Sequence, residues 1–169
     1  MDKKLTQAFV AAVKKQCGLY VRLKQAAVSE QKVLASKDGR GLDEIAKKQE
    51  DILKEIHGYE VEKKTLFEKM AADEGFKYTP ELKLQDVLFK ARDAEASEIE
   101  METAKLIILM KENALLNANN GGLIKNFLNF REFTAGLRSR MENPVQQTYT
   151  PGGLVNNVRE KQSKFDQKI

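Results

Sequence analysis

Few side chains in this sequence have the type and spacing that catalysis or metal binding requires. The single histidine, His57, lies between Ile56 and Gly58 with no second histidine or cysteine nearby, which is typical of a surface or interface residue. The single cysteine, Cys17, can form no intrachain disulfide, and its neighbours supply neither a base nor an electrophile, so we expect a buried or half-buried thiol. No nucleophile with an orienting base is indicated. We therefore predict that the protein is not an enzyme and uses no metal ion or cofactor.

The charged residues are numerous, but their pattern favours solvated helix faces. They make up 32% of the chain, and the net charge of +4 includes a balance of +6 over residues 1–41 and −6 over residues 42–118. Because blocks of opposite sign attract, we expect a basic first helix to pack antiparallel on the acidic middle region. Lysines alternate with carboxylates through most of the sequence, which argues against a nucleic-acid-binding surface. The segment "NNGG" at 119–122 lacks the Lys-Ser/Thr pair of a phosphate-binding loop.

The sequence contains no candidate for a targeting or membrane-spanning segment. The first apolar run, Ala8 to Val13, is shorter than the core of a signal peptide, and no stretch approaches the roughly eighteen apolar residues of a membrane span. We expect a cytoplasmic protein without stable membrane insertion.

Two stretches with a heptad pattern predict the first two helices, at about 3–36 and 42–73. Apolar residues recur there at alternating steps of three and four, which indicates coiled-coil-like seams, and "SKDGRG" at Ser36–Gly41 predicts the turn between them. The first seam comprises Leu5, Phe9, Ala12, Gln16, Leu19, Leu23, Ala26, Glu30 and Val33. The second comprises Leu42, Ile45, Gln49, Ile52, Ile56, Tyr59, Lys63, Leu66 and Met70.

A third helix is predicted at about 80–117. Gly75 can supply a left-handed cap for the helix before it, while Thr79 and Pro80 are expected at its own start. The five apolar residues "LIILM" at 106–110 suggest a helix that is buried on two sides. A bend or break is expected near Ala91 to Ser97.

A fourth helix is predicted at about 119–141, and the predicted helices together indicate the fold class. It ends before Pro144, because a residue that precedes proline is driven out of the helical region. We predict an all-α protein: an elongated antiparallel helical bundle or coiled coil of three to four long helices, spanning 1–141, with a flexible C-terminal tail at 142–169. The seam of the fourth helix comprises Leu116, Leu123, Phe127, Phe130, Leu137 and Met141.

The fourth helix carries more apolar surface than one seam can bury. The surplus indicates either a groove for the amphipathic helix of a partner or packing on the first three helices, and the sequence leaves both open. The candidate partner-binding residues are Leu123, Ile124, Phe127, Leu128, Phe130, Phe133 and Leu137.

Three segments in series resemble the FlgN-type flagellar export chaperones. They are "KKQEDILKEI" at Lys47–Ile56, "LLNANNGGLIKNFL" at Leu115–Leu128, and "QTYTPGG" at Gln147–Gly153. The resemblance implies a chaperone that binds hook-associated flagellar proteins in the cytoplasm, prevents their premature association, and delivers them to the export gate of the flagellar type III secretion apparatus. It implies export-gate docking by Tyr149, Gly152 and Gly153, and a structural role for Asn117, Asn120 and Gly121.

Two other classes of function are considered. A structural coiled-coil protein would use the phenylalanine-rich helix to close a homodimer, and would have no export role. A nucleic-acid-binding helical protein would bind through the basic segments 1–41 and 119–141, with a steep dependence on salt. The interleaved carboxylates argue against the second class.

Overall fold

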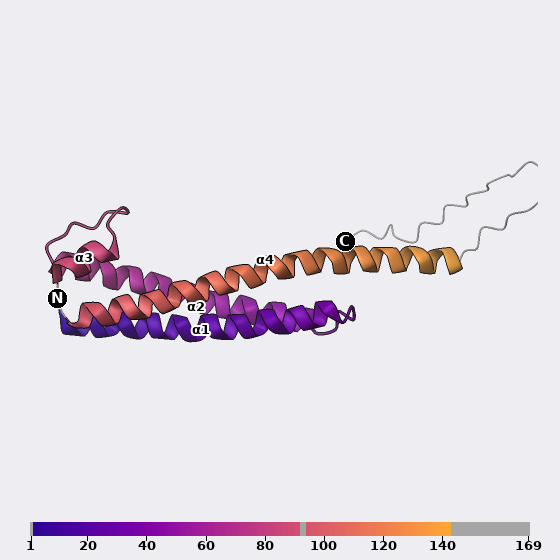
Figure 1. Ribbon diagram of the computed structural model, residues 1–169, viewed down its shortest axis with the longest axis horizontal. Coiled ribbons are helices and arrows are strands. Elements are labelled where there is room, and N and C mark those ends of the chain that lie inside the picture. Colours follow the sequence, from indigo (N-terminus) through magenta and orange to yellow (C-terminus); the bar gives the residue numbers. More distant parts are fainter. Residues whose placement is uncertain (1, 92–93, 143–169) are drawn as a thin grey trace, which may run out of the picture. The chain divides into compact units, whose positions relative to one another are not determined.

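The computed structural model describes residues 2–91 and 94–142 (Figure 1). The chain divides into two units, residues 1–127 and 128–169, and each is described by itself. The described ranges are helical and contain no strand, which confirms the predicted all-α helical bundle. The tail was predicted at 142–169; Glu142 belongs to the last helix, and the rest of that range, with Tyr149, Gly152 and Gly153, lies outside the described residues. The helices are α1 (Lys3–Ala35), α2 (Leu42–Asp73), α3 (Leu84–Ala91) and α4 (Ala94–Glu142).

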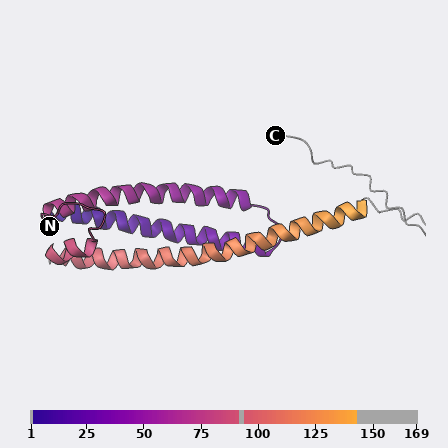
Figure 2. The same cartoon turned by 90° about the horizontal axis from the view of Figure 1, so that it is seen from above.

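In the first unit, α1 and α2 form an antiparallel hairpin. The side-chain amide of Gln16 donates a hydrogen bond to the carbonyl of Ile56 at 3.2 Å. The backbone N–H of Asp2 donates to the Asp73 carboxylate at 2.7 Å, which joins the start of α1 to the end of α2. Taken together, the two contacts require that α1 and α2 run in opposite directions. Figure 2 shows α1 between α2 and α4.

The α4 helix runs parallel to α1. Lys14 pairs with Glu98 at 2.8 Å, and further along both helices Lys24 pairs with Glu112 at 3.0 Å. These ion pairs connect the basic first helix to the acidic middle region, but in a parallel direction. The antiparallel packing that the charge blocks predicted occurs on α2, where Arg22 pairs with Glu55 at 3.6 Å.

Because α1 has a neighbour on two sides, it buries two seams. The predicted seam is buried or half-buried along its whole length. A second set, including Val10, Val13 and Ala27, is also buried and contributes to the contact with α4. The sequence reading found only the first seam.

The α2 helix and both of its ends follow the sequence predictions. All nine predicted seam positions of α2 are buried or half-buried. Gly75 adopts a φ of 75° directly after the helix, and the N–H of Phe76 donates to the Ala71 carbonyl at 2.8 Å, which closes a Schellman cap. The α1–α2 turn uses left-handed φ at Lys37 (58°), Gly39 (72°) and Gly41 (87°).

The predicted start of the third helix is wrong. The helix α3 begins at Leu84, not at Thr79 or Pro80, and the N–H of Leu82 donates to the Thr79 carbonyl at 3.1 Å in a turn. The cap is formed instead by Asp86, whose carboxylate accepts the Lys83 N–H at 3.3 Å.

The predicted boundary between helices at 117–119 is also wrong, because α4 is continuous from Ala94 to Glu142. Left-handed glycines in the described ranges occur only at 39, 41 and 75, so Gly121 and Gly122 do not end the helix. Each helical glycine costs about 1 kcal/mol relative to alanine. The contacts of the adjacent Asn120 with α1 help to offset that cost.

Candidate partner-binding surface on α4

One side of α4 faces α1 through residues at seven-residue spacing. An unbroken helix brings every seventh residue to nearly the same side, as in a coiled coil. The residues at the two ends of the row have apolar side chains, and the two residues between them have side-chain amides. The five buried residues are Ile99, Leu106, Asn113, Asn120 and Phe127.

The two asparagines in this row bind the backbone of α1 in one register. The amide of Asn113 donates to the carbonyl of Tyr20 at 3.0 Å, and that of Asn120 donates to the carbonyl of Ala27 at 2.8 Å. Both the donors and the acceptors are seven residues apart. The pairs therefore fix how far α4 is advanced along α1, which apolar contacts alone do weakly.

Asn120 also links all three long helices. Its amide donates to the Glu30 carboxylate of α1 at 2.8 Å, and the same carboxylate accepts from Gln49 of α2 at 3.2 Å. The other two motif residues, Asn117 and Gly121, are exposed, and a Cβ added to Gly121 would meet no atom within 4 Å.

Phe127 lies at the end of the first unit and packs on the α1–α2 turn. A Cβ placed on Gly39 would come within 2.6 Å of the Phe127 ring, so the ring lies directly against the glycine backbone. Phe127 is buried, Leu123 is half-buried and Ile124 is exposed. Of these three candidate residues, Phe127 therefore packs against the turn in the isolated chain.

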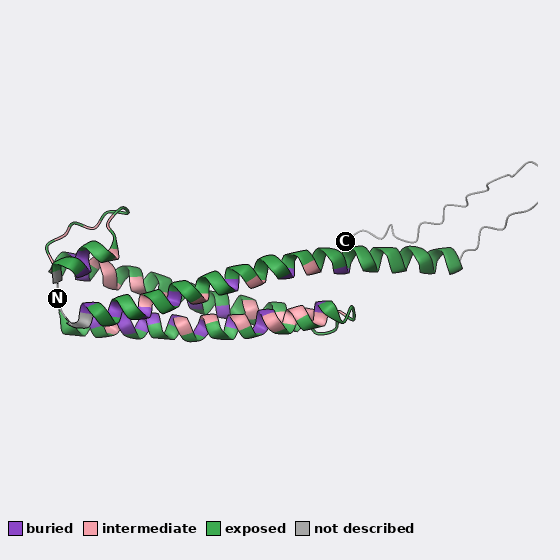
Figure 3. Ribbon diagram, in the orientation of Figure 1, coloured by how far each residue is buried: buried purple, intermediate pink, exposed green. Residues whose placement is uncertain are grey.

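The remaining candidate residues belong to the second unit, where α4 is exposed on all sides (Figure 3). The Phe133 side chain is 64% exposed and lies among other exposed apolar residues of the same helix, and it is such a group that marks a binding surface. Thr134 donates to the Phe130 carbonyl at 3.0 Å within the same helix. The exposed candidates in this unit are Leu128, Phe130, Phe133 and Leu137.

A second group of exposed apolar residues lies on the first half of α4, and the sequence reading missed it. The segment "LIILM" was expected to be buried on two sides, and this prediction is wrong. Leu106 faces α1, while Ile108 is 57% exposed and Leu115 is 65% exposed. The heptad spacing of Met101, Ile108 and Leu115 was the signal that could have revealed a separate face. The exposed members are Met101, Ile107, Ile108, Met110 and Leu115.

The described ionisable groups of the first unit include a thiol and an ammonium group whose pKa values are shifted by burial. Burial raises the pKa of the half-buried Cys17 thiol, whose sulfur lies 4.0 Å from the Glu102 carbonyl. Burial lowers the pKa of the Lys63 ammonium on α2. His57 is exposed, with Nδ1 3.7 Å from the Glu60 carboxylate. In the described ranges no three His, Cys, Asp or Glu side chains are grouped as a metal site would need.

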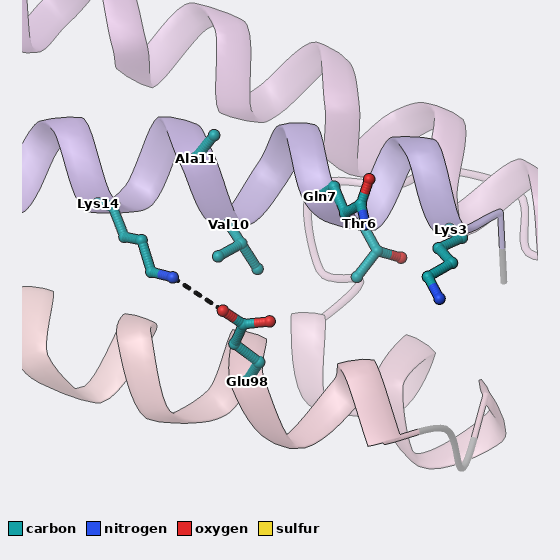
Figure 4. A pocket seen from close by; sticks show the side chains of 7 residues that line it. All are labelled: Lys3, Thr6, Gln7, Val10, Ala11, Lys14 and Glu98. Atoms are coloured by element: carbon teal, nitrogen blue, oxygen red, sulfur yellow. Dashed lines mark hydrogen bonds and ion pairs between the residues drawn. The ribbon is translucent and has the colours of Figure 1, made fainter.

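Two hollows of the first unit lie between helices. The groove in Figure 4 lies between α1 and α4, and the Lys14–Glu98 ion pair crosses it. A second hollow is lined by Phe9, Phe67 and Leu84, with Lys63 at its edge. Within residues 2–91 and 94–142, no helix is long and apolar enough to cross a membrane.

An all-α bundle with an exposed apolar helix is typical of a helical binding module. The chain belongs to the FlgN protein family, whose family model matches residues 1–157. The protein is thus a flagellar chaperone of type III export, and the matched range includes the segment that carries Tyr149. Neither the curated proteins nor the solved structures include a match to this chain.

Proposed function

We propose that this chaperone binds hook-associated flagellar proteins in the cytoplasm, prevents their premature association and delivers them to the flagellar export gate. Membership of the FlgN family supports the general role. The observation that carries the proposal is the exposure of Phe133 and Leu137 on a helix that also presents Ile124 and Leu128 to solvent. Side chains of this kind bind an amphipathic partner helix by burying its apolar stripe.

Binding on α4 would act by mass action. Each large apolar side chain that becomes buried contributes about 1.5–3 kcal/mol, so a few of them suffice for a stable but reversible complex. While the partner's apolar segment lies on α4, it is unavailable for association with other subunits. The chaperone then releases the segment at the export gate.

The export-gate contact is proposed for the C-terminal element that carries Tyr149, Gly152 and Gly153. One aromatic ring can fill a pocket while the flanking small residues add little ordering cost. Tyr149→Ala is expected to leave binding of the hook-associated protein unchanged and to reduce its export, measured in motile cells. A variant that lost binding but kept export would reverse the two roles.

The partner surface is tested by co-purification of the tagged full-length chain with co-expressed hook-associated proteins. The double variant Phe133→Asp, Leu137→Asp is expected to retain at most about a tenth of the wild-type partner, since each change places a charge in the proposed contact. The matched control is Val61→Asp, an exposed apolar residue on α2, which should retain the partner fully. Equal retention by both variants would refute this surface.

A second copy of the chain is the competing occupant of α4. Size-exclusion chromatography with light scattering distinguishes the two occupants, because it measures the mass of the chain with and without the hook-associated protein. A monomer that shifts only when the partner is added supports the proposal. A tight dimer that does not respond to the partner favours a structural homodimeric coiled coil.

A further inference from the structure

The first half of α4 has an apolar face opposite to its seam with α1. We name it the outer α4 face and define it by Met101, Ala104, Ile107, Ile108, Lys111, Leu115 and Ala118, all of which are exposed. From Met101 to Ala118 the face is about 26 Å long, at a rise of 1.5 Å per residue. A monomer rarely exposes so continuous an apolar strip without a binding role.

Lys111 lies at the centre of this face and makes no ion pair or hydrogen bond within residues 2–91 and 94–142. It lies midway between Ile107 and Leu115, and midway between Ala104 and Ala118. The nearby Glu112 is paired with Lys24, and Lys105 is paired with Glu102. An ammonium group surrounded by apolar residues therefore has no neutralising neighbour on its own helix.

The position of Lys111 argues against a second copy as the occupant. An antiparallel pair centred on the midpoint of Met101–Ala118 would set each Lys111 against Ile108 of the other copy, which leaves the charge on an apolar residue. In an antiparallel pair centred on Lys111, or in a parallel pair in register, the two Lys111 ammonium groups would meet. Like charges placed opposite each other in an interface cost several kcal/mol. A shifted antiparallel pair could set Lys111 against Glu100, but it would place Leu115 opposite Ala96, which is buried, and leave Ala118 beyond the start of the helix at Ala94.

We infer that the outer α4 face binds an amphipathic helix of the exported subunit that carries a carboxylate at the centre of its apolar stripe. Apolar residues of that helix cover Ile108 and Leu115 on either side, and its Asp or Glu pairs with Lys111. This inference rests on the proposed function. It adds a second contact surface, separate from Leu123–Leu137, and it states the chemistry that selects the partner segment.

The first arm of the test uses two synthetic helical peptides of about 18 residues, identical except for Glu or Lys at the centre of the apolar stripe. The full-length chain is expected to bind the Glu peptide about tenfold more tightly, and Lys111→Glu should reverse the preference. The matched control is Lys125→Glu, which changes an exposed lysine further along α4 and should keep the preference for the Glu peptide. Equal binding of both peptides by the wild-type chain overturns the inference.

The second arm uses the hook-associated protein and the variant Ile108→Asp, Leu115→Asp. Both residues are exposed in the free chain, so the helical circular dichroism should be unchanged. Binding is expected to fall about tenfold or more, and Val61→Asp should leave it unchanged. Wild-type-like binding by the double variant assigns the face to another ligand and refutes its role in subunit capture.

The two arms separate this inference from the proposed function. If the wild-type chain binds no hook-associated protein, the proposed function fails, while the peptide preference still reports on the charge selectivity of the face. Self-association of the free wild-type chain in light scattering, abolished by Ile108→Asp, would make a second copy the occupant and overturn the inference.

Discussion

The α4 helix meets α1 through two kinds of contact. Near α3, Ile99 and Leu106 lie in an apolar cluster with Phe9 and Val13, whereas further along the same row Asn113 and Asn120 use amide groups. Burial of a large apolar side chain contributes about 1.5–3 kcal/mol, and a hydrogen bond has a net value of about 0.5–1.5 kcal/mol. The apolar contact therefore contributes most of the stability of the packing between α1 and α4. The amide contact contributes less stability but sets the register of the two helices.

This difference suits a helix that presents its other sides to partners. A wholly apolar seam could slide by one heptad, because neighbouring registers bury similar surface. A slide by one heptad would break the hydrogen bond between Asn120 and the Glu30 carboxylate and leave one of the two amides without its observed kind of neighbour, so the polar contacts favour one register. The outer α4 face is thereby fixed relative to the α1–α2 hairpin.

The apolar contact should show the largest effect. Ile99→Ala removes a fully buried side chain next to Val13 and Leu106, and we expect a loss of about 2–5 kcal/mol in the free energy of unfolding. Urea denaturation of the full-length chain measures it. Met101→Ala on the exposed side of the same helix is the control and should change stability by less than about 0.5 kcal/mol. Equal losses would contradict the assignment of the seam.

A substitution at Gly39, which contacts Phe127 at the far end of the buried row of α4, should have an intermediate effect on stability. Alanine there meets both an unfavourable left-handed φ and the Phe127 ring, so we expect a loss of about 2 kcal/mol or more. Gly41→Ala carries the same kind of φ strain, but its Cβ meets no atom within 4 Å. It should therefore cost less, about 1 kcal/mol. The reverse order in thermal unfolding would show that Phe127 does not rest on the turn.

The amide contact should show a smaller effect than Ile99. Asn120→Ala removes hydrogen bonds to Ala27 and Glu30, and we expect a loss of about 1–2 kcal/mol. Asn119→Ala, on the exposed neighbour, should be close to neutral. A loss at Asn120 as large as that at Ile99 would remove the distinction between the two contacts.

Truncation after Met141 should have the smallest effect. The bundle contacts described here involve residues before 128, so removal of 142–169 should change neither the helical circular dichroism nor the melting temperature of the remaining chain. A large fall in either would show that the C-terminal segment contributes to the fold.

The sequence predicted the α1–α2 hairpin well, because its determinants are local and periodic. The seam of α2, the turn at Ser36–Gly41 and the left-handed cap at Gly75 follow from heptad spacing and glycine placement. The second seam of α1 was missed, since it includes small residues such as Ala27 that a search for one dominant stripe passes over.

The α4 helix was harder to predict, because contacts far away in the sequence decide it. The segment around Gly121 and Gly122 has the composition of a helix end, but Asn120 binds Ala27 and the helix continues. The apolar run at 106–110 does not by itself show which side faces α1, and only the heptad spacing of residues around it separates the two faces. A solvent-exposed partner surface also has the same composition as a core. The proposed binding residues therefore remain predictions from type and exposure.

Hydrogen–deuterium exchange of the full-length chain, alone and with a bound hook-associated protein, tests the central claim most directly. The proposed mode of binding predicts added protection in α4 peptides that cover residues 101–137, and unchanged exchange in α2 over residues 42–60. Protection confined to α2, or unchanged exchange in α4 of a complex confirmed by light scattering, would contradict α4 as the partner-binding helix.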